Sequence, residues 1–221
     1  MRDSETRELD AGQRVREFAS AHSADFPAAS RGAVVIAALE TAITKTEKQA
    51  AAQDAANLDR QEATEEKQAA INTLLTQMRA INSTARSIDN LFPGMKDQFK
   101  MSRGGDQATL NRARAYITEA TPIQDRFTDR GLPPTFLTDL QAAIDAVEEA
   151  DNHQSAALAA QTASTAGVTA ALKELRAAMN EFEAIARNTY RNDPATLAAL
   201  KSASRVERAP KKAKKDAPPS S

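Results

Sequence analysis

Two stretches of about 60 residues contain no proline, and this feature restricts the fold of the chain more than any other. The first stretch is preceded by Pro27 and followed by Pro93, and the second is preceded by Pro134 and followed by Pro194. Proline inside a helix removes a hydrogen bond and costs about 3 kcal/mol, so prolines at the ends and none between are typical of helix boundaries. We therefore expect each stretch to be helical.

Apolar side chains recur in steps of three and four along both stretches, which places them on one side of a helix. In the first stretch they are Ile36, Leu39, Ile43, Thr46 and Ala50, then Ile71, Leu74, Met78, Ile81, Ala85, Ile88 and Phe92. In the second they are Leu137, Leu140, Ile144 and Val147, then Val168, Leu172, Leu175, Met179, Phe182 and Ala186. The same phase holds polar residues in the middle of the first stretch: Gln53, Asn57, Arg60, Thr64 and Lys67.

The chain also matches itself when it is shifted by 101 residues. Without a gap, the shift gives about 20 identities over ~101 pairs, where a composition this rich in alanine gives roughly 10 by chance. The identical pairs include Phe26 and Phe127, Leu39 and Leu140, Ile43 and Ile144, Glu47 and Glu148, Gln53 and Gln154, Leu74 and Leu175, Met78 and Met179, and Pro93 and Pro194. We interpret this as a tandem duplication with a first half (1–101), a second half (102–202) and a tail (203–221). The alternative is agreement by composition alone.

Each stretch is either one continuous helix of about 57 residues, ~85 Å long, or a helical hairpin bent at its polar middle. Segment 50–68 contains no helix breaker, and Gly167 aligns with Glu66, so the candidate turn residues of the two halves do not coincide. Insertions are best tolerated at a hairpin tip, yet the halves align there without a gap. We favour continuous helices that pair antiparallel, with residues 34–43 beside 172–182 and 71–92 beside 136–147.

Shorter helices, roughly over residues 7–21 and 107–119, are expected to cover the two ends of this pair. Asp193 followed by Pro194 predicts the start of a further helix, with the aspartate as N-cap. The predicted fold class is therefore all-α. It is an elongated antiparallel helical bundle in which each half supplies a short helix and a long helix or helical hairpin.

Composition agrees with this fold and excludes several functions. The chain has 47 alanines in 221 residues and only 4% aromatic residues, which favours helices over a β-sandwich or barrel. It has no cysteine, which excludes disulfide scaffolds, thiolate metal sites and thiol nucleophiles. The first ten residues show no signal peptide, and the longest apolar run, 33–39, is far shorter than the ~18 residues of a membrane span. We expect a cytoplasmic protein with no cofactor.

Residues for catalysis are few. The chain has only two histidines, His22 and His153, and neither follows a Glu-x-x-His pattern of the kind that binds two metals in helical bundles. Glu149 stands one turn before His153, which we interpret as an exposed polar pair. No nucleophile elbow or phosphate-binding glycine loop occurs. The Arg-Gly-Gly-Asp segment 103–106 resembles an anion nest, but we interpret it as a linker in which Asp106 caps the next helix.

The charged residues in the middle of the first stretch are interpreted as a solvated helix face, because opposite charges stand at favourable spacings. They are Asp54, Asp59, Arg60, Glu62, Glu65, Glu66 and Lys67.

The tail has a distinct charge. From Arg205 onward the chain carries a net charge of +4, which leaves −5 on the preceding 204 residues. Three prolines and the closing serines predict disorder there. The candidate polyanion-binding residues are Lys211, Lys212, Lys214 and Lys215. Such lysines hold nucleic acid by counterion release, without reading its sequence. A tail that only adds solubility is the alternative.

Between Asn188 and Arg208 the sequence resembles a group of uncharacterised bacterial proteins with repeated helical halves. The likeness rests on Asn188, Tyr190, Asp193-Pro194, Thr196-Leu197 and Val206-Glu207-Arg208. It implies a helical repeat fold and no activity, cofactor or site.

These observations favour a non-enzymatic helical protein that acts as a scaffold or interaction module for a protein partner. A nucleic-acid-associated protein that uses its basic tail is the first alternative. The second is reversible attachment to lipid or hydrophobic granules through amphipathic helices. The absence of tryptophan and the acidic body make that alternative the weakest.

Overall fold

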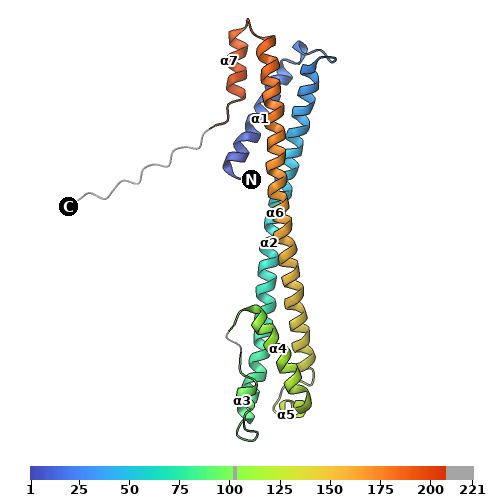
Figure 1. The fold of residues 1–221 in the computed structure, drawn as a ribbon, viewed down its shortest axis with the longest axis vertical. Coiled ribbons are helices and arrows are strands. Elements are labelled where there is room, and N and C mark those ends of the chain that lie inside the picture. Colours follow the sequence, from blue (N-terminus) through green and yellow to red (C-terminus); the bar gives the residue numbers. More distant parts are fainter. Residues whose placement is uncertain (102–103, 208–221) are drawn as a thin grey trace, which may run out of the picture. The chain divides into compact units, whose positions relative to one another are not determined.

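A computed structural model describes residues 1–101 and 104–207, and Figure 1 shows their helices. In chain order the elements are α1 (Asp3–Ala21), η1 (Ser23–Asp25), α2 (Arg31–Ile88), α3 (Met95–Gln98), α4 (Asp106–Ala120), η2 (Thr121–Ile123), α5 (Gln124–Thr128), α6 (Phe136–Thr189) and α7 (Pro194–Ala203). Within these described ranges no strand occurs. The predicted all-α fold class is confirmed.

Both proline-free stretches are single helices. α2 has 58 residues and α6 has 54, and neither is interrupted at its polar middle. The prediction of continuous helices is therefore confirmed, and the hairpin alternative is wrong. The predicted shorter helices are also present, as α1 and α4.

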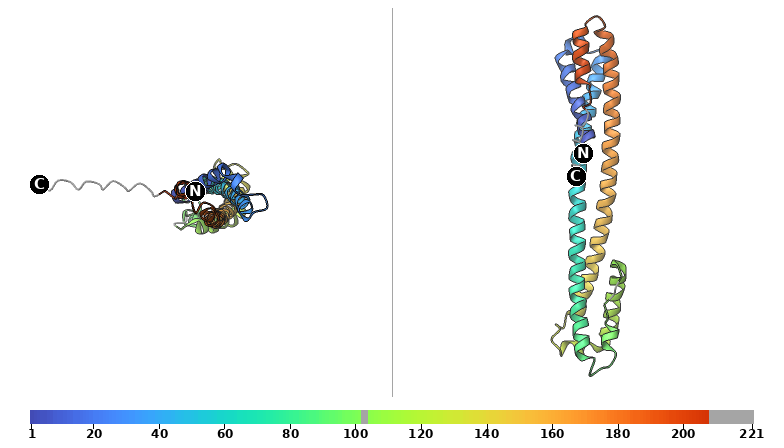
Figure 2. Two further views of the ribbon diagram at one scale, coloured as in Figure 1. Left: turned by 90° about the horizontal axis from the view of Figure 1, so that it is seen from above. Right: turned by 90° about the vertical axis from the view of Figure 1, so that its left-hand side faces the viewer.

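The helices form two compact units. The first unit contains residues 1–56 and the described residues from Gln161 onward, and the second contains residues 57–160. The first unit thus combines α1 and the beginning of α2 with the end of α6 and α7 (Figure 1). The second combines the end of α2 and α3 with α4, α5 and the beginning of α6, and α4 lies alongside this part of α6 (Figure 2). Each unit is therefore built from both halves of the sequence.

The core of the first unit lies between α2 and α6 and is closed by α1 and α7. Val35, Leu39 and Ile43 of α2 are buried with Leu172 and Phe182 of α6, which confirms the predicted antiparallel pairing at this level. Val34 is 53% exposed, because the helix turns its neighbour Val35 toward the core instead.

The core of the second unit also lies between α2 and α6, at other parts of the two helices, and is covered by other short helices. Leu74 and Met78 of α2 are buried with Leu140 and Ile144 of α6. Buried aromatic rings close this core from the segment after α3, from α4, from α5 and from the start of α6: Phe99, Tyr116, Phe127 and Phe136.

α2 ends earlier than its apolar pattern predicts. The carboxylate of Asp89 accepts hydrogen bonds from the backbone N–H groups of Gly94 and Lys96, both at 3.1 Å, and this draws the chain into a turn. Gly94 has a φ of 97°, a conformation that favours glycine. Phe92 lies in this turn and not on the helix. It is 37% exposed and packs under the guanidinium of Arg126, 3.8 Å from the ring centroid.

The two predicted helix caps have different outcomes. Asp193 accepts hydrogen bonds from the backbone N–H groups of Ala195 and Thr196 at 3.1 Å, so it is the N-cap of α7 as predicted. The prediction for Asp106 is wrong, because the N-cap of α4 is Gly105 and Asp106 is the first helical residue. The carboxylate of Asp106 lies 3.3 Å from Nζ of Lys67 on α2 instead.

Across residues 1–101 and 104–207, no helix combines the length and apolar character needed to cross a membrane.

Candidate functional site

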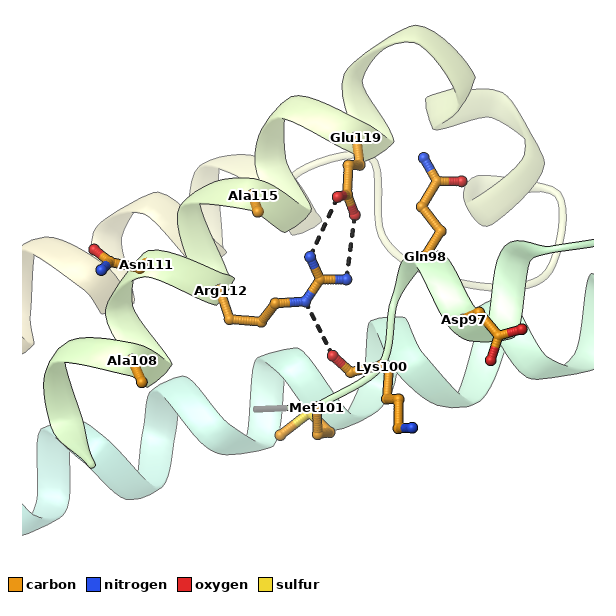
Figure 3. A pocket seen from close by; sticks show the side chains of 9 residues that line it. All are labelled: Asp97, Gln98, Lys100, Met101, Ala108, Asn111, Arg112, Ala115 and Glu119. Atoms are coloured by element: carbon orange, nitrogen blue, oxygen red, sulfur yellow. Dashed lines mark hydrogen bonds and ion pairs between the residues drawn. The ribbon is translucent and has the colours of Figure 1, made fainter. Parts of the chain in front are cut away.

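An open groove of about 670 Å³ lies in the second unit, between α4 and the segment that begins with α3. Figure 3 shows its lining residues: Asp97, Gln98, Lys100, Met101, Ala108, Asn111, Arg112, Ala115 and Glu119. Because it brings several polar side chains together in an open depression, the groove is the first candidate for function on this unit.

Arg112 is the central residue of the groove, and each of its three guanidinium nitrogens has a partner within the protein. Its Nη atoms face the two carboxylate oxygens of Glu119 at 3.2 and 3.4 Å, and its Nε donates to the carbonyl of Lys100 at 3.0 Å (Figure 3). Its guanidinium also stacks over the ring of Tyr116, 4.8 Å from the centroid. An anionic ligand would compete with Glu119 for this guanidinium. The bond to the Lys100 carbonyl joins α4 to the preceding segment.

Tyr116 also holds the segment that precedes α4. Its hydroxyl donates to the carbonyl of Phe99, which also accepts a hydrogen bond from the side-chain amide of Asn82 at 2.5 Å. Burial raises the pKa of Tyr116 to about 12, so the hydroxyl stays protonated and remains a donor. This phenol is therefore suited to holding backbone and not to acid-base catalysis at neutral pH.

A second cluster of polar groups lies in the same unit, where α2 packs on α6. Nζ of Lys67 lies 2.6 Å from the carboxylate of Asp151 and 3.2 Å from the amide oxygen of Gln154, in addition to its contact with Asp106. The Lys67 side chain is only 18% exposed. The hydrogen bond to Asp151 raises the pKa of Lys67, so the ammonium is charged at every physiological pH.

His153 of α6 faces two carboxylates of α2. Its Nδ1 lies 2.7 Å from the carboxylate of Glu66, and its Nε2 lies 3.5 Å from that of Asp59. The hydrogen bond to Glu66 raises the pKa of His153 above the ordinary value of 6.5. We call Asp59, Glu66, Lys67, Asp106, Asp151 and His153 the charged cluster. It joins the two long helices at a level where their buried contacts are mostly alanine, with Ala63, Ala150 and Ala157 in the seam.

The raised pKa of His153 predicts a pH dependence. A group whose pKa is raised by folding stabilises the fold fully below its unfolded pKa, near 6.5, and this contribution is lost as the pH rises through the folded value. A proton NMR titration should give a higher pKa for His153 in the wild type than in the Glu66→Gln variant. Glu65→Gln, on the same helix and bonded to Gln61, is the matched control and should leave the titration of His153 unchanged. Equal titration in wild type and Glu66→Gln would contradict the contact.

The structure changes the interpretation of several predicted candidates. The sequence suggested Glu149 as a neighbour of His153, whereas the carboxylates that it contacts are Glu66 and Asp59 of the neighbouring helix. His22 stacks on Phe18 with ring centroids 4.3 Å apart, and its Nδ1 lies 2.9 Å from the Phe18 carbonyl. Lys211, Lys212, Lys214 and Lys215 lie outside the described residues, as does Arg103.

The charged residues in the middle of α2 were predicted to form a solvated face, and some of them instead contact other parts of the protein. Lys67, Glu66 and Asp59 contact α6, whereas Asp54 contacts the N-terminal amino group at 3.4 Å. The sequence contained an indication of the contact between Lys67 and α6, because Lys67 stands at a position of the helical spacing that apolar residues otherwise occupy. No group of three or more metal-ligating side chains is arranged to hold a metal ion in the part of the chain that the structure describes.

No protein-family model, curated protein or solved structure matches this chain at a significant level.

Proposed function

We propose that the protein is a non-enzymatic helical scaffold that acts by binding protein partners. One observation carries this proposal: α2 and α6 each contribute residues to both compact units. A single chain therefore contains two helical units, each with its own core. The polar groups of the groove and of the charged cluster support it as well. Arg112, Tyr116 and Lys67 are each engaged by the protein's own carbonyls and carboxylates, which is the chemistry of a structural contact.

Purification of the tagged full-length protein from its native cells, after crosslinking in the cell, tests this proposal. A version truncated after Glu207 is the matched control, because it removes the basic tail and leaves both units. We expect the same protein partners, in similar amounts, from both versions. The scaffold proposal would be contradicted if nucleic acid were recovered without a reproducible protein partner and were lost on truncation. That result would favour nucleic-acid binding by the tail.

The tail carries the second candidate function. Its net charge of +4, beside a body of −5, favours binding to a polyanion such as nucleic acid. In a DNA-binding titration we expect affinity to fall steeply as salt rises, and to disappear when the chain is truncated at Arg208. A substitution of all four lysines by glutamine in the intact tail separates loss of charge from loss of chain length. Equal binding by full-length and truncated proteins would exclude this function.

We further propose that the chain arose by tandem duplication, as the 101-residue offset predicts. The amide of Gln53 donates to the hydroxyl of Thr165 at 3.2 Å, and the amide of Gln154 donates to that of Thr64 at 3.3 Å. The offset relates Gln53 to Gln154 and Thr64 to Thr165, so these are the same hydrogen bond made twice.

A second pair of contacts supports the duplication. Gln13 of α1 donates to Glu47 of α2, and Arg114 of α4 donates to Glu148 of α6. Both members of the second contact lie 101 residues after those of the first. The helix order also repeats, since each half has a short helix, a long helix and a helix after the next proline. The resemblance to bacterial repeat proteins is part of this proposal.

A further inference from the structure

The charged cluster of the second unit is missing from the equivalent place in the first. The 101-residue offset relates Lys67 to Val168, which is fully buried in the core of the first unit. It relates Asp151 to Ala50, His153 to Ala52 and Glu66 to Gly167. The neighbouring hydrogen bonds between Gln and Thr are present in both units. The two units therefore differ in charge at a level where their flanking contacts are the same.

Every interaction of the charged cluster joins the first half of the sequence to the second. Asp59, Glu66 and Lys67 belong to the first half, and Asp106, Asp151 and His153 belong to the second. Each half supplies both positive and negative groups, and each positive group contacts negative groups of the other half. The charges of one half are therefore complementary to those of the other half. Charges placed in this way determine partner choice between helices more than they add to affinity.

In a duplicated chain, each half has two similar partners to choose from: the other half of its own chain, or an equivalent half of a second copy. Because several core positions hold the same residue in both halves, such as Leu39 and Leu140 or Met78 and Met179, the apolar seam is compatible with a first half against a second half or against another first half. In a pair of two first halves, Lys67 would face Ala50 in place of Asp151, and Glu66 would face Ala52 in place of His153. Glu5 would stand in place of Asp106 and offset only part of this loss. A lysine that is 18% exposed would then lack its shortest ion pair, and removing one member of a shielded pair is unfavourable.

We propose that the charged cluster selects the partner of each half: it makes the first half bind the second half of its own chain in preference to the first half of a second copy. The inference rests on the proposed duplication and does not depend on the proposed scaffold function. The surface concerned is the level of α2 and α6 where Lys67, Asp151 and His153 meet. Its partner is the other half of the chain, recognised through opposite charge.

The test uses the full chain with a protease site inserted between Gly104 and Gly105. The folded protein is cleaved, the two halves are separated in denaturant and refolded together, and the pairs are counted by native mass spectrometry. In the wild type we expect the ratio of mixed pairs to pairs of two first halves to exceed that of a statistical mixture about tenfold. In Lys67→Val with Asp151→Ala, which copies the first unit into the second, this excess should fall about tenfold, and pairs of two first halves should appear.

Lys45→Ala with Glu174→Ala is the matched control. This pair also joins α2 to α6, with Nζ 2.7 Å from the carboxylate, but both side chains are about half exposed. It should leave the distribution unchanged. Asp151→Asn, which keeps the side-chain volume and removes its charge, guards against a double variant that does not refold, and should give a smaller fall. A mixture that is statistical in the wild type, or equal in the wild type and both cluster variants, would overturn the proposal.

Discussion

Replacing Phe182 with alanine is expected to lower the free energy of unfolding by about 3–5 kcal/mol. The ring is fully buried in the first unit and contacts two other aromatic rings, with centroids 6.3 Å from Phe18 and 5.6 Å from Phe26. These three rings come from α6, α1 and the segment before α2, so the loss leaves a cavity where three parts of the chain meet. Guanidinium denaturation, monitored by circular dichroism, measures the change.

Phe92→Ala is the matched control for this prediction. Its ring is partly exposed and contacts one guanidinium, so the expected loss is below about 1 kcal/mol. Hydrogen exchange should locate the effect of Phe182→Ala in residues 1–56 and 161–207, since these form the first unit. Equal destabilisation by the two variants would mean that Phe182 does not occupy a packed core.

Replacing Ala55 with proline is expected to cost about 3 kcal/mol or more. Ala55 lies in the middle of α2 with its side chain exposed, so the substitution removes no core contact and acts only through the backbone. The ring removes one hydrogen bond of the helix and collides with the preceding turn. Thermal denaturation and helical circular dichroism measure the loss.

Two controls isolate the backbone effect. Ala55→Gly at the same position should cost only about 1 kcal/mol. Ala156→Pro, which is 101 residues later and exposed in the middle of α6, should cost as much as Ala55→Pro. Tolerance of proline at both positions is the behaviour of a loop and would contradict continuous helices.

Much of the fold could be predicted because its determinants are local. The absence of proline and the helical spacing of residues such as Leu39 and Leu140 predicted two long helices. Their apolar ends predicted which parts of the two helices meet. The end of α2 was predicted four residues too late, because Phe92 continues the spacing while the hydrogen bonds of Asp89 to Gly94 and Lys96 end the helix.

The charged cluster could be predicted only in part, because its contacts join residues far apart in the sequence. Lys67 stands in the phase of the apolar seam, yet its neighbours suggest an exposed helix face with charges at favourable spacing. Only the antiparallel pairing of α2 and α6 brings Asp151 within 2.6 Å of it. The Arg112 groove was missed for a different reason. Its partners are near in the sequence, but one is a backbone carbonyl, which a residue pattern does not indicate, and the other is a carboxylate two turns away.

The pairing of α2 with α6 is tested most directly by a zero-length carbodiimide crosslink, read by mass spectrometry of the digested protein. Such a reagent joins only lysines and carboxylates already in contact. We expect Lys45 to be linked to Glu174 and Lys67 to Asp151, whose atoms lie 2.7 and 2.6 Å apart. Links from Lys45 to Glu65 or Glu66, with none to Glu174, would show that each stretch folds back on itself and would contradict this structure.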